Sequence, residues 1–88
     1  MAFPLTGEHR MKIHLRYCSA WNYEPKAVSL TAKILTQFKQ QVSSLELQPD
    51  QGGCFELTIG NELIYSKLET KEFPDEDQMI AAIIERVS

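Results

Sequence analysis

The sequence has few of the features that define several common protein classes. It contains only two cysteines, whereas a disulfide-stapled secreted domain carries about four to eight. The longest apolar run, residues 79–84, is far too short to cross a bilayer. The first ten residues also lack the apolar segment of a secretory signal. We therefore expect a cytoplasmic protein without a membrane segment, in which both thiols are reduced.

Basic charge and metal-binding patterns are also scarce. Lys and Arg number 9 against 12 Asp and Glu, which gives a net charge of −3 and a pI near 5.3. Without a basic excess to displace phosphate counterions, we predict no nucleic-acid partner, and an anionic membrane surface is disfavoured for the same reason. The two cysteines and two histidines do not occur at the short spacings of zinc sites, so no metal site is predicted. The acidic cluster 75–77 is interpreted as the start of a helix.

A chain of 88 residues is long enough for one small domain. Residues 1–10 contain a proline and a glycine and show no periodicity, so we expect a flexible N-terminal extension. Residues 11–88 then form the domain. A chain of this length buries only about 60–65% of its unfolded surface, which predicts a thin core.

Hydrophobic periodicity predicts the elements. Residues 12–17 and 54–59 alternate between polar and apolar side chains, as do 44–48 more briefly, and this period of two indicates strands. A helical stripe predicts a helix over about 25–40, with Pro25 in its first turn. Gly60-Asn61 fits a two-residue hairpin loop before a strand at 63–65, and a second helix is expected to begin at 73–77 and end near 87. The residues expected to face the core include Leu45 and Leu47, the first-helix stripe Ala27, Leu30, Thr31, Ile34, Leu35 and Phe38, and the second-helix stripe Met79, Ile80, Ile83, Ile84 and Val87.

The predicted order is β-α-β-β-β-α. The first β-α-β unit should be parallel with a right-handed crossover, and the hairpin adds antiparallel strands. The fold class is therefore α+β or α/β, with a four-stranded mixed sheet and two helices that cover its apolar surface. This is the thioredoxin-like arrangement.

Cys18 lies in the loop that joins the first strand to the first helix. A thiol near a helix N-terminus has its thiolate favoured by the helix dipole and by unpaired N–H groups. Arg16 and Lys26 could add positive charge. The alternative is that Cys18 is a small buried apolar residue at a strand end, and the pattern leaves both interpretations open.

Four segments resemble one known family. Residues 17–26, which include Cys18, Trp21, Tyr23 and Lys26, resemble the opening motif of the selenoprotein W family, also called Rdx. That motif begins Tyr-Cys-x-x-(selenocysteine or Cys), and vertebrate members continue Gly-Tyr-x-Pro-Lys. Residues 53–57, 60–67 and 73–74 resemble later segments of the family in the same order. The resemblance covers about residues 11–87 and implies a thioredoxin-like fold and a thiol redox role.

The sequence departs from the family pattern at Trp21, which stands where the family has selenocysteine or the second cysteine. Cys18 matches the first redox position. In a Cys-x-x-Cys pair one thiolate attacks and the other resolves the mixed disulfide. Since Trp21 has no sulfur, exchange within the motif cannot run, and enzymatic turnover is left open.

Two functions follow from this departure. In the first, Cys18 alone forms mixed disulfides with a partner protein or with glutathione, which would be a co-substrate and not a resident cofactor; no resident cofactor is expected. In the second, the chain is a redox-inactive module that docks a partner through the Cys18–Tyr23 loop, and the resemblance implies a 14-3-3-type regulatory protein as partner. Aromatic residues are enriched at interfaces, although Trp21 could equally fill core space. The residues assigned to this binding loop are Ser19, Ala20, Trp21, Tyr23 and Lys26.

A third function uses Cys54 as a second thiol. A bridge between Cys18 and Cys54 requires Cα atoms within about 7 Å. Cys54 begins the predicted strand 54–59. The start of this strand lies near the loop only if the order of the strands in the sheet brings it there. The pattern favours the simpler interpretation that Cys54 is a passive strand residue.

Overall fold

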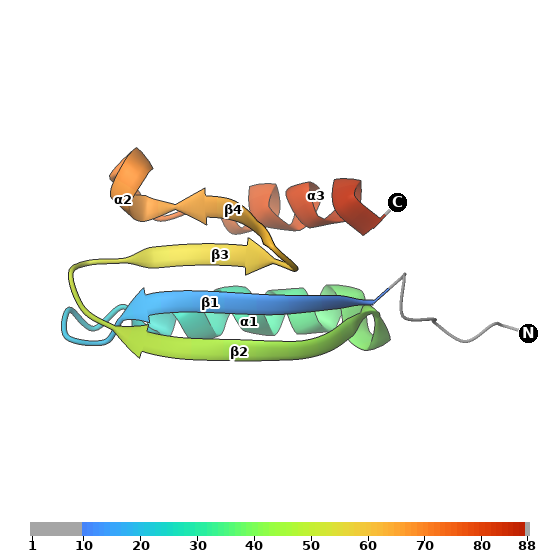
Figure 1. The fold of residues 1–88 in the computed structure, drawn as a ribbon, viewed down its shortest axis with the longest axis horizontal. Coiled ribbons are helices and arrows are strands. Elements are labelled where there is room, and N and C mark those ends of the chain that lie inside the picture. The colour runs from blue at the N-terminus through green and yellow to red at the C-terminus, as the bar shows by residue number, and fades with distance from the viewer. Residues whose placement is uncertain (1–9, 88) are drawn as a thin grey trace, which may run out of the picture.

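The computed structural model describes residues 10–87 (Figure 1). The expected flexible extension lies outside the described residues except for Arg10, which is exposed and precedes the first strand. In chain order the elements are β1 (Met11–Cys18), α1 (Glu24–Phe38), the 3₁₀ turn η2 (Lys39–Gln41), β2 (Val42–Asp50), β3 (Phe55–Ile59), β4 (Glu62–Ser66), α2 (Lys67–Thr70) and α3 (Glu76–Val87).

The four strands form one mixed sheet in the order β2-β1-β3-β4. β1 pairs in parallel with β2, from Met11↔Val42 to Cys18↔Asp50. β3 pairs antiparallel with both β1 and β4. This confirms the predicted thioredoxin-like β-α-β-β-β-α fold with its four-stranded mixed sheet.

The sheet has one apolar face and one polar face. Alternation places Ile13 and Leu15 of β1 and Leu57 of β3 in a single buried cluster with residues of α1 and α3. Both long helices therefore cover the same face, and the protein has two layers. The opposite face carries polar and charged side chains, namely Lys12, His14, Arg16, Glu56 and Thr58.

Three apolar residues predicted to face the core are exposed, which corrects the sequence-based expectation: Leu35, Leu47 and Ile84. Leu47 lies on β2, at the edge of the sheet. Leu35 and Ile84 lie at the margins of their helical stripes, beyond the residues that reach the sheet. A helix on a two-layer protein buries only a stripe about 100° wide, so flanking apolar residues remain in solvent.

Several element boundaries also differ from the prediction: β1 includes Cys18, which was expected in the loop, and α1 ends at Phe38. β2 continues through Pro49 and Asp50, two residues beyond the predicted segment 44–48, because proline is tolerated on an edge strand. The short helix α2 was not predicted, since its four residues are too few to show a helical stripe. Its end is held by the Tyr65 hydroxyl, which lies 2.7 Å from the Thr70 hydroxyl and donates to the Glu72 carbonyl oxygen at 2.8 Å.

The acidic cluster starts α3, as predicted. The Asp75 carboxylate accepts the Gln78 N–H at 3.0 Å, which satisfies a free donor of the first helical turn. Asp77 and Glu76 face Lys33 of α1, at 3.0 and 3.7 Å. These contacts join the two helices. Within residues 10–87, no group of His, Cys, Asp and Glu side chains has the arrangement of a metal site.

Candidate functional site

The loop between β1 and α1 lies at the same end of the sheet as the β2–β3 connection (Figure 1). Backbone hydrogen bonds fix it there. The Ser19 N–H donates to the Asp50 carbonyl oxygen at 3.0 Å, and the Tyr23 N–H donates to the Cys18 carbonyl oxygen at 3.1 Å. Asn22 takes a left-handed conformation with φ of 61°, which asparagine tolerates better than most residues. The loop is thus a tight turn that leads directly into the first turn of α1.

Cys18 and Cys54 are cross-strand neighbours. Cys18 ends β1, and its N–H donates to the Cys54 carbonyl oxygen at 2.9 Å. This bond continues the β1–β3 register by one step beyond Tyr17↔Phe55. Directly opposed residues in a hydrogen-bonded antiparallel pair have Cα atoms about 5.5 Å apart and side chains on the same face. The sheet order therefore meets the condition for a Cys18–Cys54 pair.

Both thiols are enclosed and unbridged. Cys18 is 0% exposed and Cys54 is 1% exposed. Neither belongs to the main apolar cluster beneath the helices. The two cysteines thus occupy a separate buried position at the end of the sheet. The burial agrees with the interpretation of Cys18 as a small buried residue at a strand end. The thiol of Cys54 lies opposite it and is a group with which the Cys18 thiol can react.

The positive charge expected near Cys18 is already neutralised. The Arg16 guanidinium lies 2.7 Å from Asp50 and 3.1 Å from Glu56, and the bond to Arg16 lowers the pKa of Asp50, with help from the Gln51 N–H. Burial raises the pKa of the Cys54 thiol, Arg16 opposes this effect, and Asp50 and Cys18 add to it. Cys54 is therefore mainly protonated at neutral pH.

Trp21 covers the β2–β3 connection instead of filling the core. Its side chain is 62% exposed, and its six-membered ring rests on Gly53. A Cβ atom placed on Gly53 would lie 2.6 Å from the Trp21 Cζ3 atom. The indole thus sits on the residue immediately before Cys54, and this contact requires glycine at position 53.

An aromatic array continues from the loop across the surface. The ring of Tyr23 makes edge contacts with Trp21 (centroids 6.1 Å apart) and with Phe73 (4.7 Å). The ammonium groups of Lys26 and Lys67 lie 5.2 and 5.1 Å from the Phe73 ring centroid. Lys26 therefore contacts an aromatic face, a favourable arrangement for a cation.

Sequence reasoning missed Phe73 and Lys67 as members of this site. Both lie far along the chain from the loop, and only the resemblance of residues 60–67 and 73–74 to family segments pointed toward them. Of the predicted loop residues, Ser19 and Ala20 are exposed. The Ser19 hydroxyl makes only a long bond of 3.4 Å to the Asp50 carbonyl oxygen. A small cleft of about 140 Å³, lined in part by Lys26 and Phe73, adjoins the array.

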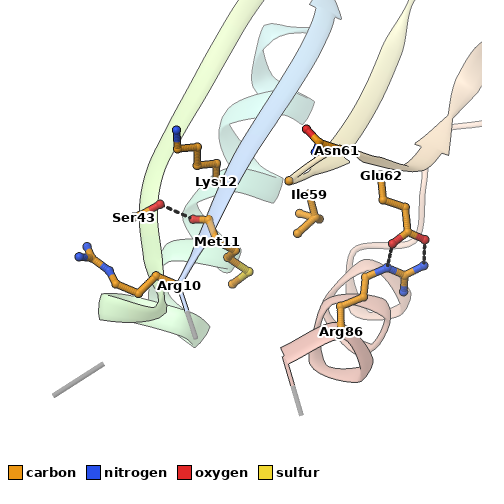
Figure 2. Close-up of a pocket in the computed structure, with 9 residues that line it drawn as sticks. Arg10, Met11, Lys12, Ser43, Ile59, Asn61, Glu62 and Arg86 are labelled. Carbon is orange, nitrogen blue, oxygen red and sulfur yellow. Dashed lines mark hydrogen bonds and ion pairs between the residues drawn. The ribbon is translucent and has the colours of Figure 1, made fainter. Parts of the chain in front are cut away.

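A larger open hollow of about 720 Å³ lies at the opposite end of the sheet. Figure 2 shows Arg86 turned toward Glu62, with which it forms a 2.7 Å ion pair. The Ser43 hydroxyl donates to the Met11 carbonyl oxygen at 2.9 Å. The hollow contains no thiol, and its carboxylate is already paired. We therefore place the candidate site at the thiol end.

Comparison with known proteins assigns the chain to a family. A model of the Rdx family matches residues 12–85. The chain belongs to the Rdx family. It is 33% identical to Migration and invasion enhancer 1 from Bos taurus, over 91% of this chain and 71% of that protein. It is 32% identical to Selenoprotein W from Gallus gallus, over 84% and 88% of the two chains.

The fold of this Rdx protein matches a solved structure. The crystal structure of a selenoprotein W-related protein from Vibrio cholerae superimposes with a TM-score of 0.85, covering 90% of this chain and 99% of that one. At 22% identity this likeness shows the fold alone. The family resemblance and the thioredoxin-like fold predicted from the sequence are both confirmed. No helix among the described residues is long and apolar enough to span a membrane.

Proposed function

We propose that this Rdx protein is a thiol redox protein whose nucleophile is Cys18, acting in redox homeostasis of the cytoplasm. The observation that carries the proposal is the position of Cys18. It ends β1 at the tight turn into α1, and it matches the first redox position in the family resemblance. Its substrates are disulfides of glutathione or of a partner protein.

The chemistry is thiol–disulfide exchange. The Cys18 thiolate attacks one sulfur of the substrate disulfide, a new S–S bond forms, and the other sulfur leaves as a thiolate. Because Cys18 is 0% exposed, the chain around it must open for a substrate to reach the thiol. Trp21 cannot resolve the mixed disulfide, so a thiol from elsewhere must do so.

Exposure to oxidised glutathione tests this proposal. The unmodified chain and Cys18→Ser are incubated with the disulfide, and all protein thiols and adducts are mapped by mass spectrometry. The proposal predicts oxidation that begins at Cys18 and disappears in Cys18→Ser. Equal oxidation of the variant, or none at Cys18, would contradict it.

The exposed Trp21 side chain favours a second candidate function, the docking of a partner protein. Trp21, Tyr23 and Phe73 with the two lysines above them offer aromatic surface beside positive charge. By family resemblance the partner would be a 14-3-3-type regulatory protein. Aromatic anchors of this kind dominate many interfaces.

The docking function has its own test. The chain has a single tryptophan, so titration with a purified 14-3-3 protein can be followed by tryptophan fluorescence in the unmodified chain. Calorimetry gives the affinity of the variants. Trp21→Ala should weaken binding, whereas Val28→Ala, at an exposed position of α1, should not. Equal affinity of both variants excludes the loop as the docking surface.

A further inference from the structure

We infer that Cys54 is the resolving thiol for Cys18, so that oxidation produces a disulfide between β1 and β3 in place of the Cys-x-x-Cys bridge that Trp21 prevents. The inference rests on the proposed function, because it names the group that completes the same reaction. It also assigns a role to the second buried cysteine.

The first support is the register of the two strands. The Cys18 N–H donates to the Cys54 carbonyl oxygen at 2.9 Å, which places the residues directly opposite one another. The expected Cα separation of about 5.5 Å lies within the range that disulfides span, about 4.4–6.8 Å. Strand alternation turns both side chains to the same face. The Cα separation therefore permits a bridge, and the Cβ atoms, about 5.5 Å apart in a hydrogen-bonded pair, must approach to about 4.5 Å for the S–S bond to form.

The second support is the enclosure of the two thiols. Both are at most 1% exposed, so a glutathionyl group on Cys18 cannot be accommodated unless the chain around the thiols moves. A mixed disulfide must hold this part of the protein open. Replacing the external group by the neighbouring Cys54 sulfur allows the surroundings to close again.

The reaction balances in two exchanges. In the first, the Cys18 thiolate attacks glutathione disulfide and releases one glutathione thiolate. In the second, the Cys54 thiol loses its proton to solvent, and its sulfur attacks the Cys18 sulfur. The Cys18–Cys54 bond forms, the bond to glutathione breaks, and a second glutathione thiolate leaves and is protonated. One disulfide is thus reduced to two thiols while two protein thiols are oxidised to one disulfide.

Proximity favours the second exchange. Cys54 is held beside Cys18 by a backbone hydrogen bond, so its attack is intramolecular. Well-oriented intramolecular groups act at effective concentrations far above those of free thiols. Attack by Cys54 should therefore resolve the Cys18–glutathione disulfide faster than dissolved glutathione does, although only the small thiolate fraction of Cys54 reacts.

The experiment follows the fate of the Cys18 adduct. The unmodified chain, Cys54→Ala and Cys54→Ser are treated with glutathione disulfide, quenched with acid, and mapped by non-reducing digestion and mass spectrometry. Cys54→Ala suits a buried site, and Cys54→Ser provides a second variant if the first does not fold. Circular dichroism checks the fold of each.

In the unmodified chain we expect a cross-linked peptide pair containing Cys18 and Cys54 with no lasting glutathione adduct. In the Cys54 variants we expect a Cys18–glutathione adduct that persists at least about tenfold longer. A stable adduct on Cys18 of the unmodified chain, without the cross-link, overturns the inference and leaves the proposed function standing. Absence of any reaction at Cys18 in all three chains overturns both.

Discussion

At the scale of single residues, the chemistry of the site depends on which form of the Cys54 thiol the fold prefers. Burial raises the pKa of this thiol, and the nearby Asp50 and Cys18 act in the same direction, whereas Arg16, itself bonded to Asp50 and Glu56, opposes them. A raised pKa in the folded state means that folding favours the protonated thiol. The contribution of this thiol to the free energy of unfolding is fully present below its pKa in the unfolded chain, about 8.5. The contribution is lost as the pH rises through the pKa of the thiol in the folded protein.

This dependence gives a first prediction. Raising the pH from 7 to 10 should lower the urea midpoint of the unmodified chain more than that of Cys54→Ala, because the variant has no thiol to ionise at this position. All other titrating groups are common to both chains and cancel in the difference. Urea unfolding under reducing conditions measures it. Equal losses in both chains would show that the Cys54 thiol ionises as freely in the folded protein as in the unfolded one.

Trp21 gives a second prediction at the same scale. Because its side chain is 62% exposed, Trp21→Cys should change the free energy of unfolding by less than about 1 kcal/mol, as at other surface positions. In the background of Cys54→Ala, mild oxidation should then remove both remaining thiols by joining positions 18 and 21. Thiol counting and peptide mapping detect this bridge. If the folded variant keeps two free thiols while a control dithiol is oxidised, the loop does not hold positions 18 and 21 in the geometry of a Cys-x-x-Cys pair.

At the scale of elements, the site depends on contact between two connections. The loop after β1 places Trp21 on Gly53, in the connection between β2 and β3. Gly53 has a φ of 75° and Gly52 a φ of 82°, so both need the conformational freedom of glycine. They differ in surroundings, because a Cβ at Gly52 would meet no atom within 4 Å.

These neighbouring glycines form a matched pair for a third prediction. Gly53→Ala should displace the indole and raise the rate at which Cys18 and Cys54 are alkylated in the folded protein. Gly52→Ala carries the same kind of backbone strain without touching Trp21, so it should change the rate much less. Alkylation followed by mass spectrometry measures both thiols. Equal acceleration in the two variants would mean that strain, and not the indole cover, controls access.

The elements also show what the sequence could and could not predict. The order of strands and helices followed from local periods of two and 3.6, whereas Cys18, expected in the loop, is the last residue of β1. The Cys18–Cys54 contact could not follow from periodicity, because it depends on β3 pairing with β1 at one particular register. The contact of Trp21 with Gly53 likewise arises between segments far apart in the chain. The same holds for the positions of the lysine ammonium groups over the Phe73 ring.

At the scale of the whole molecule, the two-layer architecture leaves a thin core and one polar sheet face. Both helices pack on the face that carries Ile13, Leu15 and Leu57, and a small domain of this kind has little stability in reserve. A bridge between β1 and β3 would close the long segment that contains α1 and β2. Loop-entropy arguments put the stabilisation at up to about 4 kcal/mol, less any strain in the bridge.

A fourth prediction follows. The oxidised chain should unfold at a higher urea concentration than the reduced chain, and Cys54→Ala should show no such gain after the same treatment. Urea unfolding of both redox forms, with the disulfide content verified by mass, makes the comparison. A lower midpoint for the oxidised chain would indicate that the bridge distorts the sheet.

The most direct test of the central claim is a glutathione titration at constant ratio of reduced to oxidised glutathione. An internal Cys18–Cys54 disulfide releases two glutathione molecules for each one consumed as disulfide, so its equilibrium depends on the square of the reduced glutathione concentration. Tenfold dilution of total glutathione at fixed ratio should then raise the ratio of oxidised to reduced protein about tenfold. In Cys54→Ala, where only a mixed disulfide forms, dilution should leave the ratio unchanged. An unmodified chain that does not respond to dilution would contradict the account.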